Sequence, residues 1–311
     1  MGIRTVNNTL QSFLDNFLRS GTDASGEFVV SFSATGGTIS TPGNGYTYHF
    51  FTAPGNFVVT NTGANSDSVE YLVVAGGGAA GFISNRGAGG GGAGGFRTGS
   101  TPVTVGSYPV VVGDGGSPAP TTGGNGSPSI VFGITATGGG GGAEGTTYGT
   151  VGNPGGSGGG AGNLPSVYPA GQGSGNTPPT SPPQGNPGGP DGNYSGPTYG
   201  GAGGGGAGGS GDATPGPGVG SATGGIGRAA FSGDTGIPAS YGTPGPTPGR
   251  WFAGGGASSS SGLTGTGGSG GGGPAAYPGP GTPGSVNTGG GGGAGSGSGG
   301  PGIVIIRYLS S

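Results

Sequence analysis

The side chains in this 311-residue sequence that are best suited to non-covalent recognition are aromatic rings and arginines lying between runs of glycine. A rigid aromatic ring offers a large contact area at a small entropic cost, and arginine adds charge-assisted hydrogen bonds to anionic groups such as those of acidic glycans. The alternative is that the same rings cap and shield the ends of a glycine-rich body. Both roles stay open for the candidates, which are the cluster Arg250, Trp251 and Phe252, together with Arg228, Tyr194, Tyr199, Tyr241 and Tyr277.

Catalytic and metal-binding patterns are missing from the sequence. Cysteine is absent, which removes thiol catalysis and zinc–thiolate sites. The single histidine, His49, lies between Tyr48 and Phe50 in a predicted strand without a nucleophile or carboxylate motif beside it, so we interpret it as structural. The ten acidic residues are scattered and form no pair typical of a glycosidase or a calcium loop. We therefore expect no catalytic residues, no metal, no cofactor and no enzymatic activity.

The charge and hydropathy of the chain exclude two further classes of partner. A formal net charge of −3 gives no basic surface typical of nucleic-acid binding. No stretch is apolar for long enough to span a bilayer, and the first four residues lack the apolar core of a signal peptide. We expect neither nucleic-acid binding nor membrane insertion.

The elements that position these side chains begin with an N-terminal segment, residues 1–25, whose composition differs from that of the rest of the chain. Its apolar residues recur at helical spacing, which predicts an amphipathic α-helix that ends near Gly21. Because an isolated helix of this length is marginal in water, its apolar stripe requires a partner. A self-associating coiled coil, a docking helix and a helix folded back on its own chain all agree with the pattern. The stripe consists of Ile3, Val6, Leu10, Phe13, Leu14, Phe17 and Leu18.

Residues 26–137 are predicted to form a small antiparallel β-module. Apolar and polar residues alternate between residues 27 and 74, and glycine, proline and asparagine mark turns between the alternating stretches. Further strands are predicted at 103–112 and around 130–137. The last apolar run, 303–306, has no polar alternation, so we expect a strand covered on both faces. We expect this C-terminal segment, 301–311, to return to the β-module beside residues 71–74.

Glycine accounts for 95 residues and gathers in runs, most densely between residues 138 and 300. Glycine at this density builds no side-chain core, so the backbone itself must provide the packing. In polyproline-II geometry, with about three residues per turn, every N–H and C=O points outward, and the absence of Cβ lets neighbouring helices bond to each other. Ordering glycine costs about 0.5–1 kcal/mol more per residue than ordering alanine, and each buried backbone bond returns about 0.5–1.5 kcal/mol. Such a bundle orders as a whole or not at all, and the alternative is a flexible linker.

These patterns predict a mainly β fold with a polyglycine-II helical bundle and little regular α structure. In chain order, the expected parts are the N-terminal helix (1–25), the β-module (26–137), the polyglycine-II body with its surface loops (138–300) and the C-terminal strand (301–311). The aromatic and arginine candidates fall in segments that connect glycine runs, which are 163–199, 211–252, 257–266 and 274–288.

A series of short sequence motifs, in a fixed order, carries a family resemblance. They occupy residues 46–57, 70–78, 89–99, 106–116, 134–143 and 299–308. The series resembles the glycine-rich domain found in tail-fibre and other virion proteins of tailed bacteriophages, cyanophages among them. The resemblance runs from about residue 45 to the C-terminus. A looser similarity exists to the tip adhesins of the long tail fibres of T-even-like phages, a family known for stacked polyglycine-II helices whose connecting loops bind the host surface.

The resemblance implies a virion protein of a tail fibre or other surface appendage, with a role in attachment to the host. The loop candidates Arg228, Arg250, Trp251 and Phe252 and the loop tyrosines would then bind a receptor, either a host cell-surface glycan or an outer-membrane protein. The N-terminal stripe from Val6 to Leu18 is not covered by the resemblance. Its position suggests attachment to other virion proteins or to sister chains, for which a trimer is one arrangement.

Two other functions remain as alternatives. The first is a structural spacer or head-decoration protein of the virion that binds no receptor. The second is an ice-binding protein, because polyglycine-II bundles also occur in that class. Irregular loops and the absence of cysteine oppose the ice-binding interpretation, since that class typically has a flat, regular face and commonly has disulfides.

Overall fold

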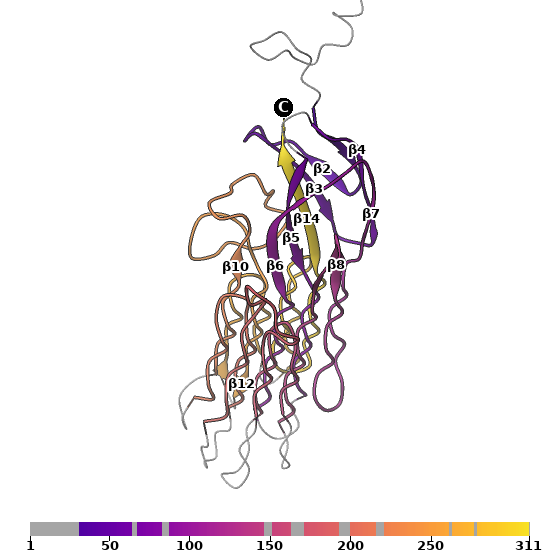
Figure 1. The fold of residues 1–311 in the computed structure, drawn as a ribbon. Coiled ribbons are helices and arrows are strands. Elements are labelled where there is room, and N and C mark those ends of the chain that lie inside the picture. Colours follow the sequence, from indigo (N-terminus) through magenta and orange to yellow (C-terminus); the bar gives the residue numbers. More distant parts are fainter. Residues whose placement is uncertain are drawn as a thin grey trace, which may run out of the picture.

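A computed structural model describes residues 31–63, 67–82, 87–145, 151–162, 171–192, 200–215, 221–260, 263–276 and 279–310. The expected N-terminal helix, with Val6, Leu10, Phe13, Leu14, Phe17 and Leu18, lies outside these residues. Within the described residues the chain is mainly β, with several small antiparallel sheets and no helix. The molecule is elongated, with the larger sheets at one end and the glycine segments running side by side at the other (Figure 1).

The larger sheet has five strands, and the C-terminal strand lies at its centre. Its order is β2 (Thr38–Ser40), β3 (Tyr46–Phe51), β14 (Ile303–Leu309), β5 (Ser68–Val74) and β6 (Phe96–Pro102), and every neighbouring pair is antiparallel. Ile305 of β14 is paired with Phe50 on one side and with Leu72 on the other. The strand that ends the chain therefore joins two strands from its first quarter.

A three-stranded sheet and a hairpin lie beside the larger sheet in the β part. The small sheet consists of β1 (Ser33–Thr35), β4 (Gly55–Asn61) and β7 (Gly106–Val110), again antiparallel. The single strand expected around 130–137 is instead a hairpin of β8 (Ser129–Val131) and β9 (Ile134–Ala136). Its two connecting residues, Phe132 and Gly133, have φ values of 53° and 73°. Positive φ at both positions is the geometry of a tight two-residue hairpin turn, which divides the expected strand.

Both faces of the five-stranded sheet are buried, which explains the unbroken apolar run in β14. Val304, Ile306 and Tyr308 lie in one core together with residues of the three-stranded sheet. Ile303 and Ile305 lie in a second core on the opposite face. Because successive side chains of a strand point to opposite faces, a strand covered on both sides needs apolar residues throughout. The second core is closed by the segment between β10 (Arg228–Ala229) and β11 (Trp251–Phe252), which form a two-stranded pair.

The glycine segments are joined by main-chain hydrogen bonds that follow a three-residue rotation. Along segment 89–94, three successive amides donate to three different neighbouring segments, and the fourth amide donates again to the same segment as the first. The bonds run from Gly89 to Ala143, Gly90 to Ala202, Gly91 to Gly292, Gly92 to Gly140, Ala93 to Gly205 and Gly94 to Gly289, with N–O distances of 2.8 to 3.0 Å. A backbone with three residues per turn produces this rotation.

The carbonyls of the same segment accept from three other neighbours. Those neighbours are segments 75–81, 157–160 and 254–257. The amides of Gly81 and Gly78 donate to Gly89 and Gly92, those of Gly160 and Ser157 donate to Gly90 and Ala93, and that of Gly256 donates to Gly91. Segment 89–94 is thus surrounded by donors and acceptors and forms the interior of the bundle.

Glycine is required where these segments touch. A Cβ placed on Gly91 would lie 2.1 Å from the carbonyl oxygen of Gly78, and one on Gly141 would lie 1.7 Å from that of Gly123. Both separations are far inside the contact distance of carbon and oxygen, and the obstructing atoms are backbone. Segments 75–81 and 89–94 precede residue 138, so the β-module and the glycine body are not divided at that boundary. The strands continue directly into the bundle.

Two short strands lie away from the sheets. β12 (Ser259–Ser260) and β13 (Leu263–Thr264) form an antiparallel pair. This pair lies at the end of the bundle opposite the larger sheets (Figure 1). The bundle therefore has a sheet end, where the strands enter it, and a far end, where the chain turns between glycine segments.

Candidate functional site

The structure places Trp251 and Phe252 in the interior of the molecule. Trp251 is 9% exposed and Phe252 is 0% exposed. The indole N–H of Trp251 donates to the carbonyl of Thr247 at 3.1 Å, and Phe252 belongs to the core that covers the five-stranded sheet. These two rings therefore offer almost no surface to a partner, which disagrees with the exposed position that a receptor-binding role requires.

Arg250 and Tyr241 of loop 228–252 also make contacts within the chain. The guanidinium of Arg250 donates to the carbonyls of Tyr241 at 2.7 Å, of Ala239 at 2.9 Å and of Gly242. The ring of Tyr241 stacks on Phe50 of β3, with centroids 4.3 Å apart and planes 8° apart. Both contacts match the capping and shielding role. Tyr241 is therefore beside Arg250, whereas Tyr194, Tyr199 and Tyr277 lie outside the described residues.

Arg228 is the predicted residue that lines a pocket. The pocket has a volume of about 470 Å³ and lies between the β5–β6 edge of the larger sheet and β10. Its polar lining includes Glu70, Thr98, Ser100, Arg228, Ser232 and Arg307, and its apolar lining includes Phe96 and Phe231. Arg228 donates from Nη1 to the carbonyl of Pro183 at 3.3 Å, and neither of the two ion pairs among the described residues includes it. We call this the junction pocket.

Arg307 forms the charged back wall of the junction pocket. Its guanidinium pairs with Glu70, with Nη2 at 2.5 Å and Nε at 2.7 Å from Oε2, and with Asp234 at 3.0 Å. The guanidinium carbon also lies 4.1 Å from the ring centroids of both Tyr46 and Phe231. Burial opposes the charge of Arg307, but the hydrogen bond to Glu70 and the two carboxylates outweigh burial and raise the pKa of Arg307 above its usual value. This side chain fastens loop 228–252 to the sheet.

Asp234 is held by further donors inside the same network. The hydroxyl of Tyr48 donates to its carboxylate at 2.9 Å and the amide of Gly236 at 2.7 Å. The side-chain amide of Asn44 donates to the Tyr48 oxygen at 2.7 Å. Burial raises the pKa of Tyr48 above its ordinary value, so the hydroxyl keeps its proton and acts as a donor. Asp234 and Tyr48 thus have their partners within the network, which gives the pocket structural support.

The sequence contains a signal for one half of this network. Glu70 and Arg307 are single charges in otherwise apolar stretches that are expected to be neighbours, and the structure makes them direct partners across β5 and β14. A cross-strand ion pair follows from that register. Asp234 has no such signal, because loop 228–252 has no periodic pattern that would place it against the sheet.

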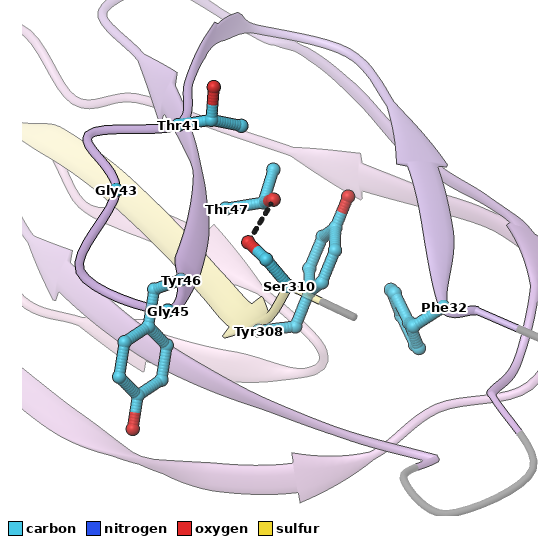
Figure 2. A pocket seen from close by; sticks show the side chains of 8 residues that line it. All are labelled: Phe32, Thr41, Gly43, Gly45, Tyr46, Thr47, Tyr308 and Ser310. Carbon is cyan, nitrogen blue, oxygen red and sulfur yellow. Dashed lines mark hydrogen bonds between the residues drawn. The ribbon is translucent and has the colours of Figure 1, made fainter. Parts of the chain in front are cut away.

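A second pocket lies where the chain enters the described fold. It has a volume of about 430 Å³ and is lined by Phe32, Thr41, Tyr46, Thr47, Tyr308 and Ser310, together with two glycines. Figure 2 shows the hydroxyls of Thr47 and Ser310 facing each other, 2.8 Å apart, while the ring of Tyr46 is directed away from Tyr308. No charged side chain lines this pocket. Its composition supports packing of a neutral group.

His49 lies beneath this second pocket, in the interior. One ring nitrogen is 2.7 Å from the carbonyl oxygen of Gly36, and the other is 3.3 Å from the hydroxyl of Tyr308. Burial lowers the pKa of His49, although the contact with Gly36 opposes this effect. The imidazole is also edge-on to Phe57, with centroids 5.0 Å apart. These contacts fit a structural histidine on a strand.

An exposed aromatic ring, which is not among the candidates predicted from the sequence, lies at the far end of the bundle. Phe82 is 40% exposed and ends the segment that leaves β5. Its amide donates to Thr121 at 3.2 Å, and its carbonyl accepts from Gly145 at 3.1 Å. Together with Pro280, Ser296 and two glycines it lines a pocket of about 320 Å³. The ring is therefore exposed while its backbone is fixed by two other segments.

Two classes of site are not found in the part of the chain that the structure describes. It contains no cluster of three or more histidine, cysteine or carboxylate side chains arranged to hold a metal ion. It also contains no helix with the length and hydropathy needed to cross a bilayer.

The sheets and the hydrogen-bonded glycine segments define a mainly β, glycine-rich class of protein. The family model described as glycine-rich domain matches residues 52–309. The chain therefore belongs to this glycine-rich domain family. A comparison with curated proteins gives no match.

Proposed function

We propose that this chain is a structural protein of a bacteriophage virion, carried on a tail fibre or another surface appendage, and that it attaches the particle to the host surface. The proposal is supported by the series of sequence motifs between residues 46 and 308 and by membership of the glycine-rich domain family. Its physical basis is a platform of polyglycine-II helices. The observation that carries the platform is the three-residue rotation of hydrogen bonds along segment 89–94.

A platform of this kind suits an appendage because its rigidity comes from the backbone. Interior amides and carbonyls of segment 89–94 bond to neighbours on all sides. Because the bonds lie between segments rather than within them, no single segment moves without breaking bonds to several others. Described residues that are bonded to such a body, such as Phe82 and loop 228–252, keep fixed positions, which lowers the entropic cost of binding.

The surfaces available for attachment lie at both ends of the bundle. Phe82 is exposed at the far end on a fixed backbone, and Arg228 faces the junction pocket at the sheet end. We propose a host cell-surface glycan or an outer-membrane protein as the partner. The N-terminal segment from Val6 to Leu18 would join the chain to other virion proteins or to sister chains.

Adsorption to cells tests the proposal. Purified protein should bind susceptible bacterial strains in a saturable manner and should reduce infection when it is added before the phage. The Gly91→Ala variant is a control for the platform, because a disordered bundle should lose this binding. Absence of binding to every susceptible strain would contradict an attachment role.

One observation favours a structural spacer or head-decoration protein as a second candidate. The Arg250, Trp251 and Phe252 cluster, expected to meet a receptor, instead packs and bonds within the chain. In this interpretation the buried aromatic residues of the described chain serve its own packing and meet no receptor. In that case the purified protein should bind virion proteins. An excess of it, added to the cells before the phage, should leave adsorption of the phage unchanged.

A further inference from the structure

The junction pocket is a built site with one cation that lacks a carboxylate partner. Arg228 stands on β10 and is half-buried. Its hydrogen bond within the described residues is the long one to Pro183, made by Nη1 at 3.3 Å. Arg228 also lines the junction pocket, and its other guanidinium donors make no hydrogen bond to a described residue. A guanidinium matches a carboxylate with two parallel hydrogen bonds, which fixes both the charge and the orientation of a ligand.

Glu70 gives the same pocket an acceptor. Both printed contacts with Arg307 use its Oε2 atom, and its side chain is 40% exposed. Among the described residues, Oε1 has no hydrogen-bond partner. A carboxylate in this position accepts hydroxyl groups, and it repels a compact dianion such as phosphate. The ligand that fits carries one negative charge at one side and hydroxyls at the other.

The floor of the pocket is apolar and held in a strained conformation. Phe96 and Phe231 are 4% and 8% exposed, and Phe231 has a φ of 40°, which a bulky residue rarely adopts. Arg307 lies over the Phe231 ring at 4.1 Å and helps to hold it there. An apolar floor with a polar rim suits the C–H face of a sugar ring, and about 470 Å³ accommodates a monosaccharide.

We propose that the junction pocket binds a hexuronate, a sugar ring bearing one carboxylate, with the carboxylate on Arg228 and ring hydroxyls on Glu70. This inference rests on the proposed function, because it names the class of surface glycan that the chain attaches to. Ser100, exposed on β6, supplies a further hydroxyl at the rim. The sugar binds non-covalently and is released chemically unchanged.

Titration of the purified full-length chain with D-glucuronic acid and D-glucose at neutral pH tests the proposal. Saturation-transfer NMR should show saturable binding of glucuronate, with glucose weaker by roughly tenfold because it lacks the charge-assisted bond to Arg228. The Arg228→Gln variant should reduce glucuronate affinity to that of glucose. The Glu70→Gln variant should weaken both sugars.

Arg97→Gln is the matched control, because Arg97 also lies on an edge of this region, on β6, but does not line the pocket. It should leave both affinities unchanged, and circular dichroism should show that each variant is folded. Equal affinity for the two sugars, or unchanged glucuronate binding by Arg228→Gln, would overturn the proposal. Failure to bind glucuronate with normal adsorption to cells would remove this inference and leave the attachment role standing.

Discussion

Gly91 shows at the scale of one residue why the sequence is so rich in glycine. Its Cα lies beside the carbonyl of Gly78, and an added Cβ would approach that oxygen to 2.1 Å. Neither atom can move without disturbing hydrogen bonds to other segments. A single methyl group is therefore enough to open the interior of the bundle. The same clash, 1.7 Å from the Gly123 oxygen, occurs at Gly141.

The substitution Gly91→Ala should destabilise the protein strongly. A clash with backbone inside a packed interior costs typically 1–3 kcal/mol and occasionally more. Gly209→Ala is the matched control, because a Cβ there would lie 3.5 Å from Cγ1 of Ile226 and 4.0 Å from its backbone nitrogen, both ordinary contact distances. Thermal unfolding followed by circular dichroism should show a much lower melting temperature for Gly91→Ala and little change in it for Gly209→Ala. Equal stability of the two variants would mean that the segments do not pack in this way.

His49 predicts how stability depends on pH. Burial lowers its pKa in the folded protein below the ordinary value of 6.5, so the unfolded chain binds a proton more readily. The contribution of His49 is therefore fully present above about pH 6.5 and is lost as the pH falls through the lower pKa of the folded state. Melting temperatures measured between about pH 7.5 and pH 5 should fall, and the fall should be smaller in the His49→Gln variant. An identical pH profile for the two proteins would show that His49 is not responsible.

Loop 228–252 is the element whose role changes most between sequence and structure. Trp251 and Phe252 pack beneath it, Arg250 bonds to three of its carbonyls, and Asp234 joins it to Arg307 of β14. The loop covers one face of the larger sheet, where β14 would otherwise expose Ile303 and Ile305. It acts as a lid that completes the core.

The substitution Trp251→Ala should therefore lower stability before it affects any binding. Truncating a buried tryptophan costs about 3–5 kcal/mol, and the hydrogen bond to Thr247 is lost with it. Chemical denaturation should show this loss, while Trp251→Phe should retain more of the stability. If Trp251→Ala keeps the stability of the parent protein but loses adsorption to cells, the ring is a recognition residue and the packing role is contradicted.

The elements that the sequence predicts are those with a side-chain pattern. Alternation predicts β3 and β4, and the unbroken apolar run of β14 predicts its place inside the sheet. β6, with the sequence FRTGSTP, has no apolar alternation because it is an exposed edge strand, and it is not predicted. The neighbours of each glycine segment are also not predictable, because one glycine run is chemically identical to another. For the site, residue type identifies Arg228, whereas Trp251 and Phe252 are equally typical of an interior and of a binding surface.

The whole molecule is built by interleaving strands with glycine segments. β5 runs into segment 75–81, and segment 89–95 runs back into β6. The sheet therefore fixes the positions of the glycine segments at one end, and the bundle in turn fixes the spacing of the strands. This connection offers a route by which segments without side chains reach an ordered arrangement. It also implies that the sheets and the bundle should unfold together.

Hydrogen exchange measured amide by amide tests the central claim most directly, because the account depends on main-chain bonds between glycine segments. Amides of segments 75–81, 89–95, 139–143, 203–206, 254–257 and 289–293 should exchange as slowly as those of β14. Exchange at the rate of a free peptide in these segments, with β14 still protected, would contradict the account.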